Sequence, residues 1–158
     1  LPPRAWAVSV LVLHVYCVLQ GGDLSAHSIR KLLADKLMVL FVANQRQDWH
    51  WFEDVLAYDN ARLSQAMIET GLATNTTLYV ETGLRSLRWL MALQTAPSGC
   101  FRPVGSKSFG RIRHQPAAFD QRPVEAAATI SAWLAARRVN DSEEWPKAAL
   151  RAFAWFLV

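Results

Sequence analysis

Hydrophobic residues recur at helical spacing along almost the whole chain, and no stretch alternates apolar and polar positions as a half-buried strand would. This spacing places apolar side chains on one face of an α-helix. The pattern therefore predicts an all-α protein. The expected helices cover residues 4–20, 25–43, 54–71, 77–94, 122–138 and 143–157.

A weak internal repeat relates the expected helices in pairs. The segments GGDLSAH, ATNTTLY and RVNDSEEW each place Asp or Asn at a turn, namely Asp23, Asn75 and Asp141. An aromatic ring follows four residues later and a leucine nine residues later in each segment. Side-chain oxygens of Asp and Asn cap helix N-termini, so we expect helix, short turn and helix in each unit. The chain would then be three antiparallel helical hairpins.

The links between the expected hairpins, residues 44–53 and 95–121, are longer than the turns inside them. If the helices alternate up and down, the first, third and fifth run parallel, and the segments before them meet on one rim. We call this the long-loop rim. It would gather the segments LPPRAW, DWHWFED and AAFDQRPVE. Long ordered loops usually carry function, so we expect a site there.

The segment AWAVSVLVLHVYCVL, residues 5–19, is uncharged and raises the question of a membrane. It is shorter than the roughly 20 residues that span a bilayer. Arg4 precedes it, as in a signal peptide, but GGD follows where a small-residue cleavage site is needed. We therefore favour a core helix and expect no membrane partner.

Composition limits the function classes. With 52% hydrophobic and 19% charged residues, the chain of 158 residues can bury a core, and we expect residues 1–158 to form one domain. The formal charge of +4 comes from scattered basic residues, which argues against nucleic-acid binding. Cys17 and Cys100 have no metal spacing, and free thiols favour the cytoplasm. No metal or cofactor motif occurs, so we expect neither.

A stripe of residues runs along the expected third helix and mixes apolar with polar positions. Its members are Glu53, Leu56, Asn60, Leu63 and Met67. An unpaired buried polar group costs about 1–3 kcal/mol, so Glu53 and Asn60 need protein partners or a wet cavity. Helix capping and a site are both open interpretations, and nearby aromatic residues favour a site slightly.

The segment FDQRPVEA is the second candidate. Pro123 suits the first position of a helix, and Glu125 then lies in the first turn, where the helix dipole stabilises a carboxylate. Capping alone accounts for Glu125, and Asp120 could orient the loop. Taken together, Glu53, Asp54, Asp120 and Glu125 would start two parallel helices on the long-loop rim.

Paired carboxyl groups about 5–10 Å apart are what glycoside cleavage requires. Sugar epimerisation would instead need a histidine pair or another acid–base pair, and His50 and His114 are available in the long loops. The basic residues of the second loop could hold a phosphate or an acidic sugar, although such residues are more often simply solvated. They are Arg102, Lys107, Arg111 and Arg113.

Several motifs resemble a known family. The segments are WHWFEDVLAYDNARLSQAMIETG, GLRSLRWLMALQ, GCFRPVGS, FDQRPVEAAATISAW and RAFAWFL. They resemble the helical carbohydrate domain of bacterial glycosyltransferase-type proteins, which is similar to six-hairpin glycosidases and sugar epimerases with an (α/α)6 toroid. His50 and Arg122 depart from the family pattern, which has Pro and Gln there.

The resemblance implies roles for matching residues. The implied catalytic residues are Glu53, Asp54, Asp120 and Glu125. The implied substrate-binding residues are Trp49, Trp51, Tyr58, Asp59, Asn60, Arg62, Arg102 and Gln121. Further positions that match the family motifs are Phe52, Pro103, Val104, Gly105, Phe119 and Pro123.

The chain contains half of the hairpins of a full toroid, so we expect self-association or a fragment of a longer protein, because uncovered apolar faces usually mark interfaces. Three hypotheses for its function remain open. The first is a glycosidase-like acid/base site on a carbohydrate-active domain attached to a glycosyltransferase. The second is a non-catalytic module that binds a glycan or a partner, and the third is a purely structural helical repeat.

Overall fold

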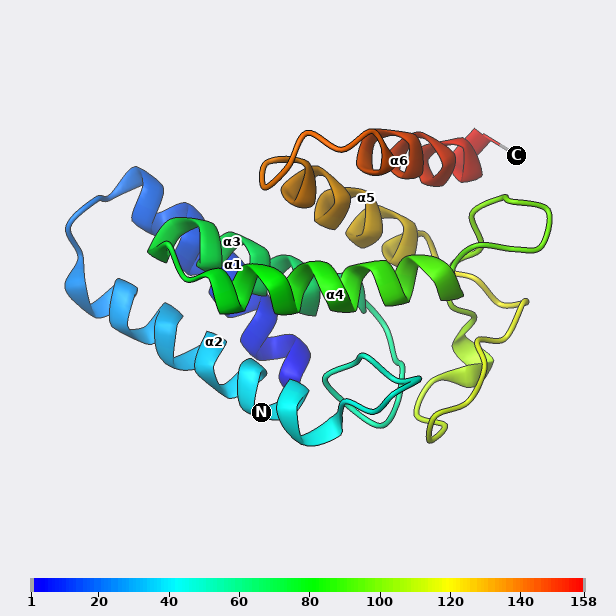
Figure 1. Ribbon diagram of the computed structural model, residues 1–158, viewed down its shortest axis with the longest axis horizontal. Helices are drawn as coiled ribbons and strands as arrows, with labels where there is room; N and C mark the ends of the chain where they lie inside the picture. Colours follow the sequence, from blue (N-terminus) through cyan, green and yellow to red (C-terminus); the bar gives the residue numbers. More distant parts are fainter. Residues whose placement is uncertain (1, 158) are drawn as a thin grey trace.

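The computed structural model describes residues 2–157, which form six α-helices and no β-strand (Figure 1). The helices are α1 (Pro3–Leu19), α2 (Leu24–Asn44), α3 (Ala61–Thr74), α4 (Thr77–Leu93), α5 (Pro123–Arg137) and α6 (Glu144–Ala154), and the short 3₁₀ turns are η1 (Ser106–Ser108) and η2 (Trp155–Leu157). The all-α class is confirmed. Helices α1, α2, α4 and α5 begin and end within one residue of the prediction.

The predicted start of the third helix is wrong. Helix α3 begins at Ala61 rather than at residue 54, so Glu53 and Asp54 lie in a loop and start no helix. The backbone of Asp59 has a left-handed φ of 55°, which interrupts a right-handed helix there. Leu56 is nevertheless fully buried, because the loop itself covers the core. Burial thus produced a helix-like spacing in a segment without helical backbone.

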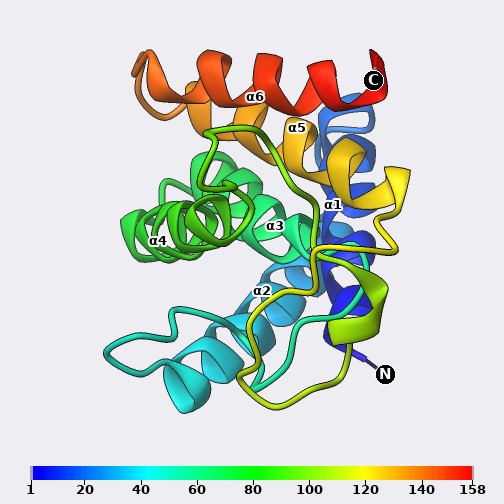
Figure 2. The same ribbon diagram turned by 90° about the vertical axis from the view of Figure 1, so that its right-hand side faces the viewer.

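Helix α3 is the centre of the molecule and packs against α1, α2, α4 and α5 (Figures 1 and 2). Nine of its fourteen residues are buried, which agrees with this central position. Helix α6 packs on α5 at the opposite side from α2. A fully buried glycine, Gly83 of α4, faces Ile68 and Ser64 of α3 so closely that a β-carbon there would lie 2.6 Å from the Ile68 side chain. The close approach of α3 and α4 at this point therefore requires glycine.

The predicted caps have mixed outcomes. Asp23 caps α2, because its carboxylate accepts a hydrogen bond of 3.0 Å from the Ala26 N–H. Asn75 instead ends α3 in the left-handed conformation, which Asn tolerates. Asp141 lies before the cap of α6, which is Glu143. The prediction of an N-terminal cap is therefore wrong at Asn75 and at Asp141.

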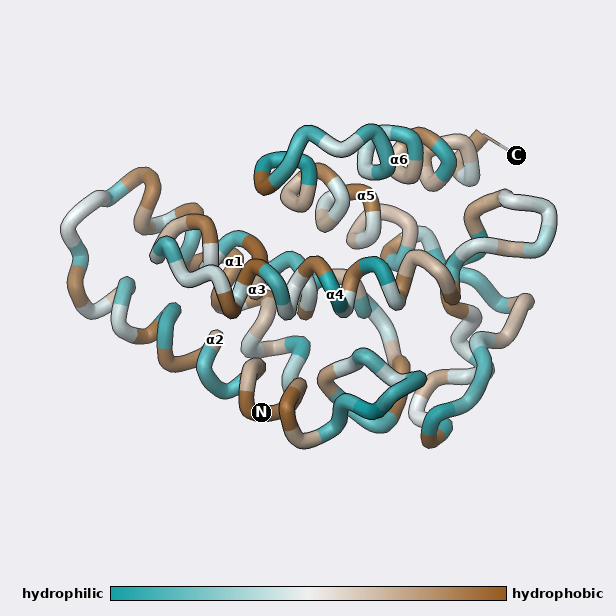
Figure 3. Tube along the Cα trace, viewed as in Figure 1, coloured by the Kyte–Doolittle hydropathy of each residue, from teal (hydrophilic) through white to brown (hydrophobic). Residues whose placement is uncertain are grey.

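Helix α1 is only half buried, so the prediction of a core helix holds for one of its faces. Ala7 and Val10 are completely buried, whereas Val12 is 62% exposed and Leu19 is 74% exposed. Hydrophobic residues recur along both α1 and α2 in Figure 3. Among residues 2–157, no helix has the length and apolar character that crossing a membrane requires.

The two long loops lie side by side. The Arg113 N–H donates to the Asp54 carbonyl at 2.7 Å, and the Gly110 N–H donates to the Leu56 carbonyl at 2.8 Å. Val55 and Ile112 form an isolated antiparallel bridge between these hydrogen bonds. The segments before α3 and α5 therefore meet at one end of the molecule, as the long-loop rim requires.

Candidate functional site

A buried arginine connects the start of α1 to the segment before α3. Arg4 is only 5% exposed although it lies in the first turn of α1. Its guanidinium donates to the Glu53 carboxylate, to the Tyr58 carbonyl at 2.6 Å and to the Asn60 side-chain oxygen at 3.0 Å. A buried charge requires such partners, because desolvation otherwise makes it costly. Arg4 therefore ties three points of the rim together.

Asn60 extends this network to α5. Its side-chain oxygen accepts from Arg4 and from the Ala57 N–H, and its side-chain nitrogen donates to the Glu125 carboxylate at 2.9 Å. Asn60 is completely buried. These contacts place the starts of α1, α3 and α5 at one end of the molecule. We call Arg4, Glu53, Asn60 and Glu125 the rim network.

Glu125 is a buried carboxyl group with a raised pKa. It is completely buried in the first turn of α5, as predicted, and it accepts hydrogen bonds from the Asp59 N–H and from the Asn60 side chain. Burial raises its pKa from an ordinary 4.5 to about 7, although the hydrogen bonds favour the ionised form. Near neutral pH, Glu125 can therefore hold or release a proton.

Asp59 lies beside the network, at the edge of an apolar groove along α1. Its carboxylate is 3.5 Å from the Arg62 guanidinium, and the Arg62 guanidinium also donates to the Gln65 side chain at 2.9 Å. Burial raises the pKa of Asp59, and Arg62 opposes the rise. Both residues line the α1 groove of about 660 Å³, whose other lining side chains come from α1. Asp59 and Arg62 are thus adjacent to the network and line the α1 groove.

The other two predicted catalytic carboxylates lie outside the rim network. Asp54 forms an ion pair of 2.6 Å with Arg113 at the surface. Asp120 is exposed, accepts a hydrogen bond from the Ser106 hydroxyl and has a left-handed φ of 64°. The structure brings Glu53 and Glu125 together through Arg4 and Asn60, but Asp54 and Asp120 take no part in these hydrogen bonds.

Two of the aromatic residues predicted to stack on sugar rings are buried. Trp51 is completely buried, lies 5.4 Å from the Phe52 ring and stacks on Trp89 with ring centroids 5.6 Å apart. Trp49 is 7% exposed, and its indole N–H donates to the Glu53 carbonyl at 2.7 Å. Tyr58 is 52% exposed, with the Arg4 guanidinium 5.7 Å from its ring centroid. Of these three rings, only that of Tyr58 offers a large free surface.

The remaining predicted binding residues are spread along the second loop. Arg102 is half-buried, and its Nε atom has no hydrogen-bond partner among the described residues. Gln121 accepts a hydrogen bond of 2.7 Å from the Trp155 indole and donates to the Ala118 carbonyl at 2.7 Å. His114 lies on the surface of the second long loop, whereas His50 belongs to the first. Neither Arg102 nor Gln121 bonds to a member of the rim network.

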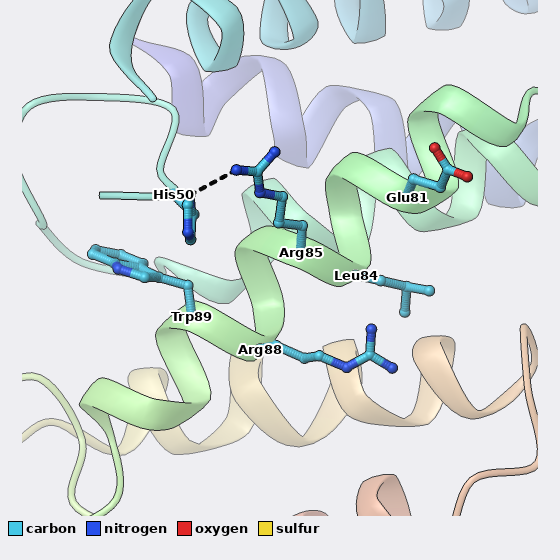
Figure 4. Close-up of a pocket in the computed structure, with 6 residues that line it drawn as sticks. All are labelled: His50, Glu81, Leu84, Arg85, Arg88 and Trp89. Atoms are coloured by element: carbon cyan, nitrogen blue, oxygen red, sulfur yellow. Dashed lines mark hydrogen bonds between the residues drawn. The ribbon is translucent and has the colours of Figure 1, made fainter. Parts of the chain in front are cut away.

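A groove of about 580 Å³ lies between α4 and the first long loop (Figure 4). We call it the α4 groove, and its lining residues are His50, Glu81, Leu84, Arg85, Arg88 and Trp89. Arg85 donates a hydrogen bond of 3.2 Å to His50 Nδ1, so a neutral His50 carries its proton on Nε2. Burial and the nearby Arg85 lower the pKa of His50. Neutral His50 therefore has a donor left for a ligand.

The two arginines of the α4 groove differ in their partners. Arg88 forms an ion pair of 2.8 Å with Glu144 and lies 5.0 Å from the Trp145 ring centroid. Within residues 2–157, Arg85 has no carboxylate at ion-pair distance, and its hydrogen-bond partner is His50. The Trp89 indole N–H is fixed by the Asp48 carbonyl at 3.0 Å. The groove thus combines a fixed indole with a guanidinium that is open to solvent.

The sequence did not lead to Arg4, Arg85 or Arg88 as site residues. Arg4 precedes an uncharged segment, so its position suggested a flank rather than a buried ion. Arg88 and Trp89 come three and four residues after Arg85, which places both of them beside Arg85 on the surface of α4. That spacing was the available signal for the α4 groove. The loop that covers one side of the groove could not be placed from the sequence.

No family model, no curated protein and no solved structure matches this chain. The geometry of the rim network and of the grooves is therefore the basis on which a function is inferred.

Proposed function

We propose that this chain is a carbohydrate-binding helical domain and that a neutral saccharide binds in the α4 groove. The observation that carries the proposal is the composition of this groove. Sugars present hydroxyl groups around an apolar ring face, so their sites combine donors and acceptors with an aromatic surface. Arg85 and His50 supply donors, Glu81 supplies an acceptor, and Trp89 with Leu84 supplies the apolar surface.

The charges around the groove favour a neutral ligand over an anion. Arg85 and Arg88 carry positive charge, while Glu81 in the groove and Glu144, paired with Arg88, carry negative charge. Because the pKa of His50 is lowered, its ring is neutral at pH 7 and adds no charge. A ligand with many hydroxyl groups can donate hydrogen bonds to Glu81 and accept them from the arginines, whereas an anion would be repelled by the Glu81 carboxylate.

Binding is favoured over cleavage because the predicted catalytic carboxylates Glu53 and Glu125 already bond to other groups of the protein. Glu53 is paired with Arg4, and Glu125 is completely buried behind Asn60 and the Asp59 backbone. A general acid or base must come within hydrogen-bond reach of its substrate. In this arrangement the rim network acts as a scaffold that fixes the loop carrying His50.

The proposed architecture is three helical hairpins that make about half of an (α/α)6 toroid. The packing of α1 on α2, α3 on α4 and α5 on α6 supports it, together with the common end at which α1, α3 and α5 begin. The same proposal includes self-association through α1, whose exposed residues include Val12 and Leu19. Sedimentation velocity should give a mass above one chain. A monomer that stays compact across protein concentrations contradicts the self-association.

Isothermal titration calorimetry with a panel of neutral mono- and disaccharides tests saccharide binding. We expect saturable binding to at least one sugar, weakened about tenfold by Arg85→Gln, which removes a hydrogen-bond donor, and by Trp89→Leu, which removes the aromatic surface. The matched control is Arg46→Gln, an exposed arginine whose side chain bonds only to nearby backbone carbonyls. Absence of saturable binding, or equal effects of Arg85→Gln and Arg46→Gln, contradicts the proposal.

A second candidate function is glycosidase-like acid/base chemistry, and the raised pKa of Glu125 favours it. Carboxyl groups whose environments separate their pKa values are typical of acid/base sites. Glu125 would be the acid and Glu53, paired with Arg4, its partner carboxyl group, and Asn60 and Arg4 join the two. Release of nitrophenol from aryl glycosides, abolished by Glu125→Gln in a variant that keeps its helical circular dichroism, would favour this candidate over simple binding.

A further inference from the structure

A second groove, of about 910 Å³, lies between the second long loop and the end of α6. We call it the α6 groove. Residues 98–101 of the loop, the start of α5 and the end of α6 with η2 contribute its walls. The lining side chains used below are Phe101, Gln121, Pro123, Arg151, Trp155 and Phe156. The groove shares no lining residue with the α4 groove.

The apolar walls of the α6 groove are held in place by their neighbours. Phe101 is only 9% exposed and contacts Trp133 edge to face, with ring centroids 5.8 Å apart. The Trp155 indole N–H donates to the Gln121 side chain at 2.7 Å, and the Trp155 ring contacts the Phe156 ring edge to face at 5.3 Å. The walls therefore offer aromatic surface that is already ordered, which lowers the entropic cost of binding.

Arg151 is the single charged residue among the side chains that line this groove. Its guanidinium donates one hydrogen bond of 3.4 Å to the Gly99 carbonyl. Within residues 2–157, Arg151 has no carboxylate at ion-pair distance, and its side chain is exposed. A guanidinium has five N–H donors, so several remain for a ligand. The groove thus differs in charge from the α4 groove, whose lining includes the acidic Glu81 beside its two arginines.

We infer that the α6 groove binds a small aromatic monoanion, whose ring lies against Phe101, Trp155 and Phe156 and whose anionic group pairs with Arg151. The volume is within the roughly 300–1,000 Å³ that small-molecule sites occupy, and such sites are mainly apolar with a few fixed polar groups. A planar guanidinium suits a carboxylate or sulfonate, because it can donate two parallel hydrogen bonds. A second charge on the ligand would find no partner in the walls.

Two fluorescent dyes of similar shape separate the charge from the apolar surface. Anilinonaphthalene sulfonate carries one negative charge, and phenylnaphthylamine is neutral. We expect the sulfonate to bind with energy transfer from tryptophan and to bind more tightly than the neutral dye. Arg151→Gln should weaken sulfonate binding about tenfold and leave the neutral dye unchanged, since it removes the charged donor that pairs with the sulfonate. Trp155→Ala should weaken both dyes.

Matched controls exclude binding elsewhere. Phe153→Ala removes an exposed ring of α6 that does not line the groove, and Val12→Ser lowers the apolar character of the exposed face of α1. Neither variant should change dye binding. If Trp155→Ala loses its helical circular dichroism, Phe156→Ala supplies the same comparison, because Phe156 is 43% exposed and less essential to packing.

Equal affinity of Arg151→Gln and the unchanged protein for the sulfonate overturns the inference. So does loss of dye binding in Val12→Ser, which would place the dye on α1 instead. Saccharide binding in the α4 groove is measured separately, so failure of one proposal does not decide the other.

Discussion

The rim network and the α4 groove are built from the same kinds of side chain. They differ in whether the hydrogen-bond donors of these side chains find partners within the protein. In the rim network, Arg4 is 5% exposed and its guanidinium bonds only to groups of this chain that lie far along the sequence. In the α4 groove, Arg85 is exposed and its hydrogen-bond partner is a neutral imidazole. A polar cluster that satisfies itself holds a fold together, whereas one with donors left over is available to a ligand. The following predictions test that difference.

The largest expected effect is the loss of the buried guanidinium. Arg4→Met should lower the free energy of unfolding by about 3–5 kcal/mol, because it leaves the Glu53 carboxylate and the Asn60 side chain without a partner in a buried region. Urea denaturation followed by circular dichroism measures this change. The control Arg111→Met alters an exposed arginine and should cost far less. Equal costs for the two variants would remove the structural role of the network.

The next largest effect is a dependence of stability on pH through Glu125. Its pKa rises from 4.5 to about 7 on folding, so the folded state binds more protons between these values. Stability from this group is fully present below pH 4.5 and is lost as pH rises through about 7, by roughly 3 kcal/mol. Denaturation at several pH values should show the loss, and Glu125→Gln should flatten it.

The contribution of His14 to stability changes with pH in the opposite direction, so it must be separated from the contribution of Glu125. Burial lowers the pKa of His14, so its contribution to stability is lost as pH falls, not as it rises. The difference between the unchanged protein and Glu125→Gln isolates the carboxyl group, since His14 is present in both. A pH profile that is identical in both proteins would contradict the raised pKa of Glu125.

A smaller effect is expected from the contact between α3 and α4, which positions one wall of the α4 groove. Gly83→Ala would place a methyl group 2.6 Å from Ile68 Cγ1 and 2.9 Å from the Ser64 carbonyl. Overpacking of this kind costs about 1–3 kcal/mol. The control is Gly21→Ala, where the nearest atom would be the Cys17 carbonyl oxygen at 3.9 Å. A shift in the thermal midpoint for Gly21→Ala as large as that for Gly83→Ala would contradict the close approach.

The smallest effect is expected at Asp54. Its ion pair with Arg113 is exposed, with side-chain exposures of 45% and 38%, so Asp54→Asn should change the free energy of unfolding by less than about 1 kcal/mol. Saccharide binding should also be unchanged, because Asp54 lies outside the α4 groove. A large loss of binding in Asp54→Asn would place the ligand on the rim instead.

Most of the helices could be predicted because each depends on a local pattern. The apolar spacing located α1, α2, α4 and α5 to within one residue, and Pro123 marked the start of α5. The same reasoning failed before α3, where Leu56 and Asn60 are buried from a loop. Periodicity records which residues are buried, and it does not record whether the backbone between them is helical.

Three of the four members of the rim network could be selected from the sequence. Glu53, Asn60 and Glu125 were chosen from the sequence, and the structure joins them by hydrogen bonds. Arg4, which completes the network, was missed. The aromatic residues Trp49 and Trp51 were chosen as sugar contacts and lie in the core, because a composition rich in aromatic residues suits both environments.

The sequence by itself determined that the chain is helical, where most helices begin and end, and that its polar residues gather before α3 and α5. Those properties follow from side chains a few residues apart. Tertiary structure alone decided that Asn60 meets Arg4 and Glu125, which are 56 and 65 residues away, and that Arg85 remains open to solvent. Pairing and burial depend on how distant segments pack, and that packing decides which charges hold the fold and which can bind a ligand.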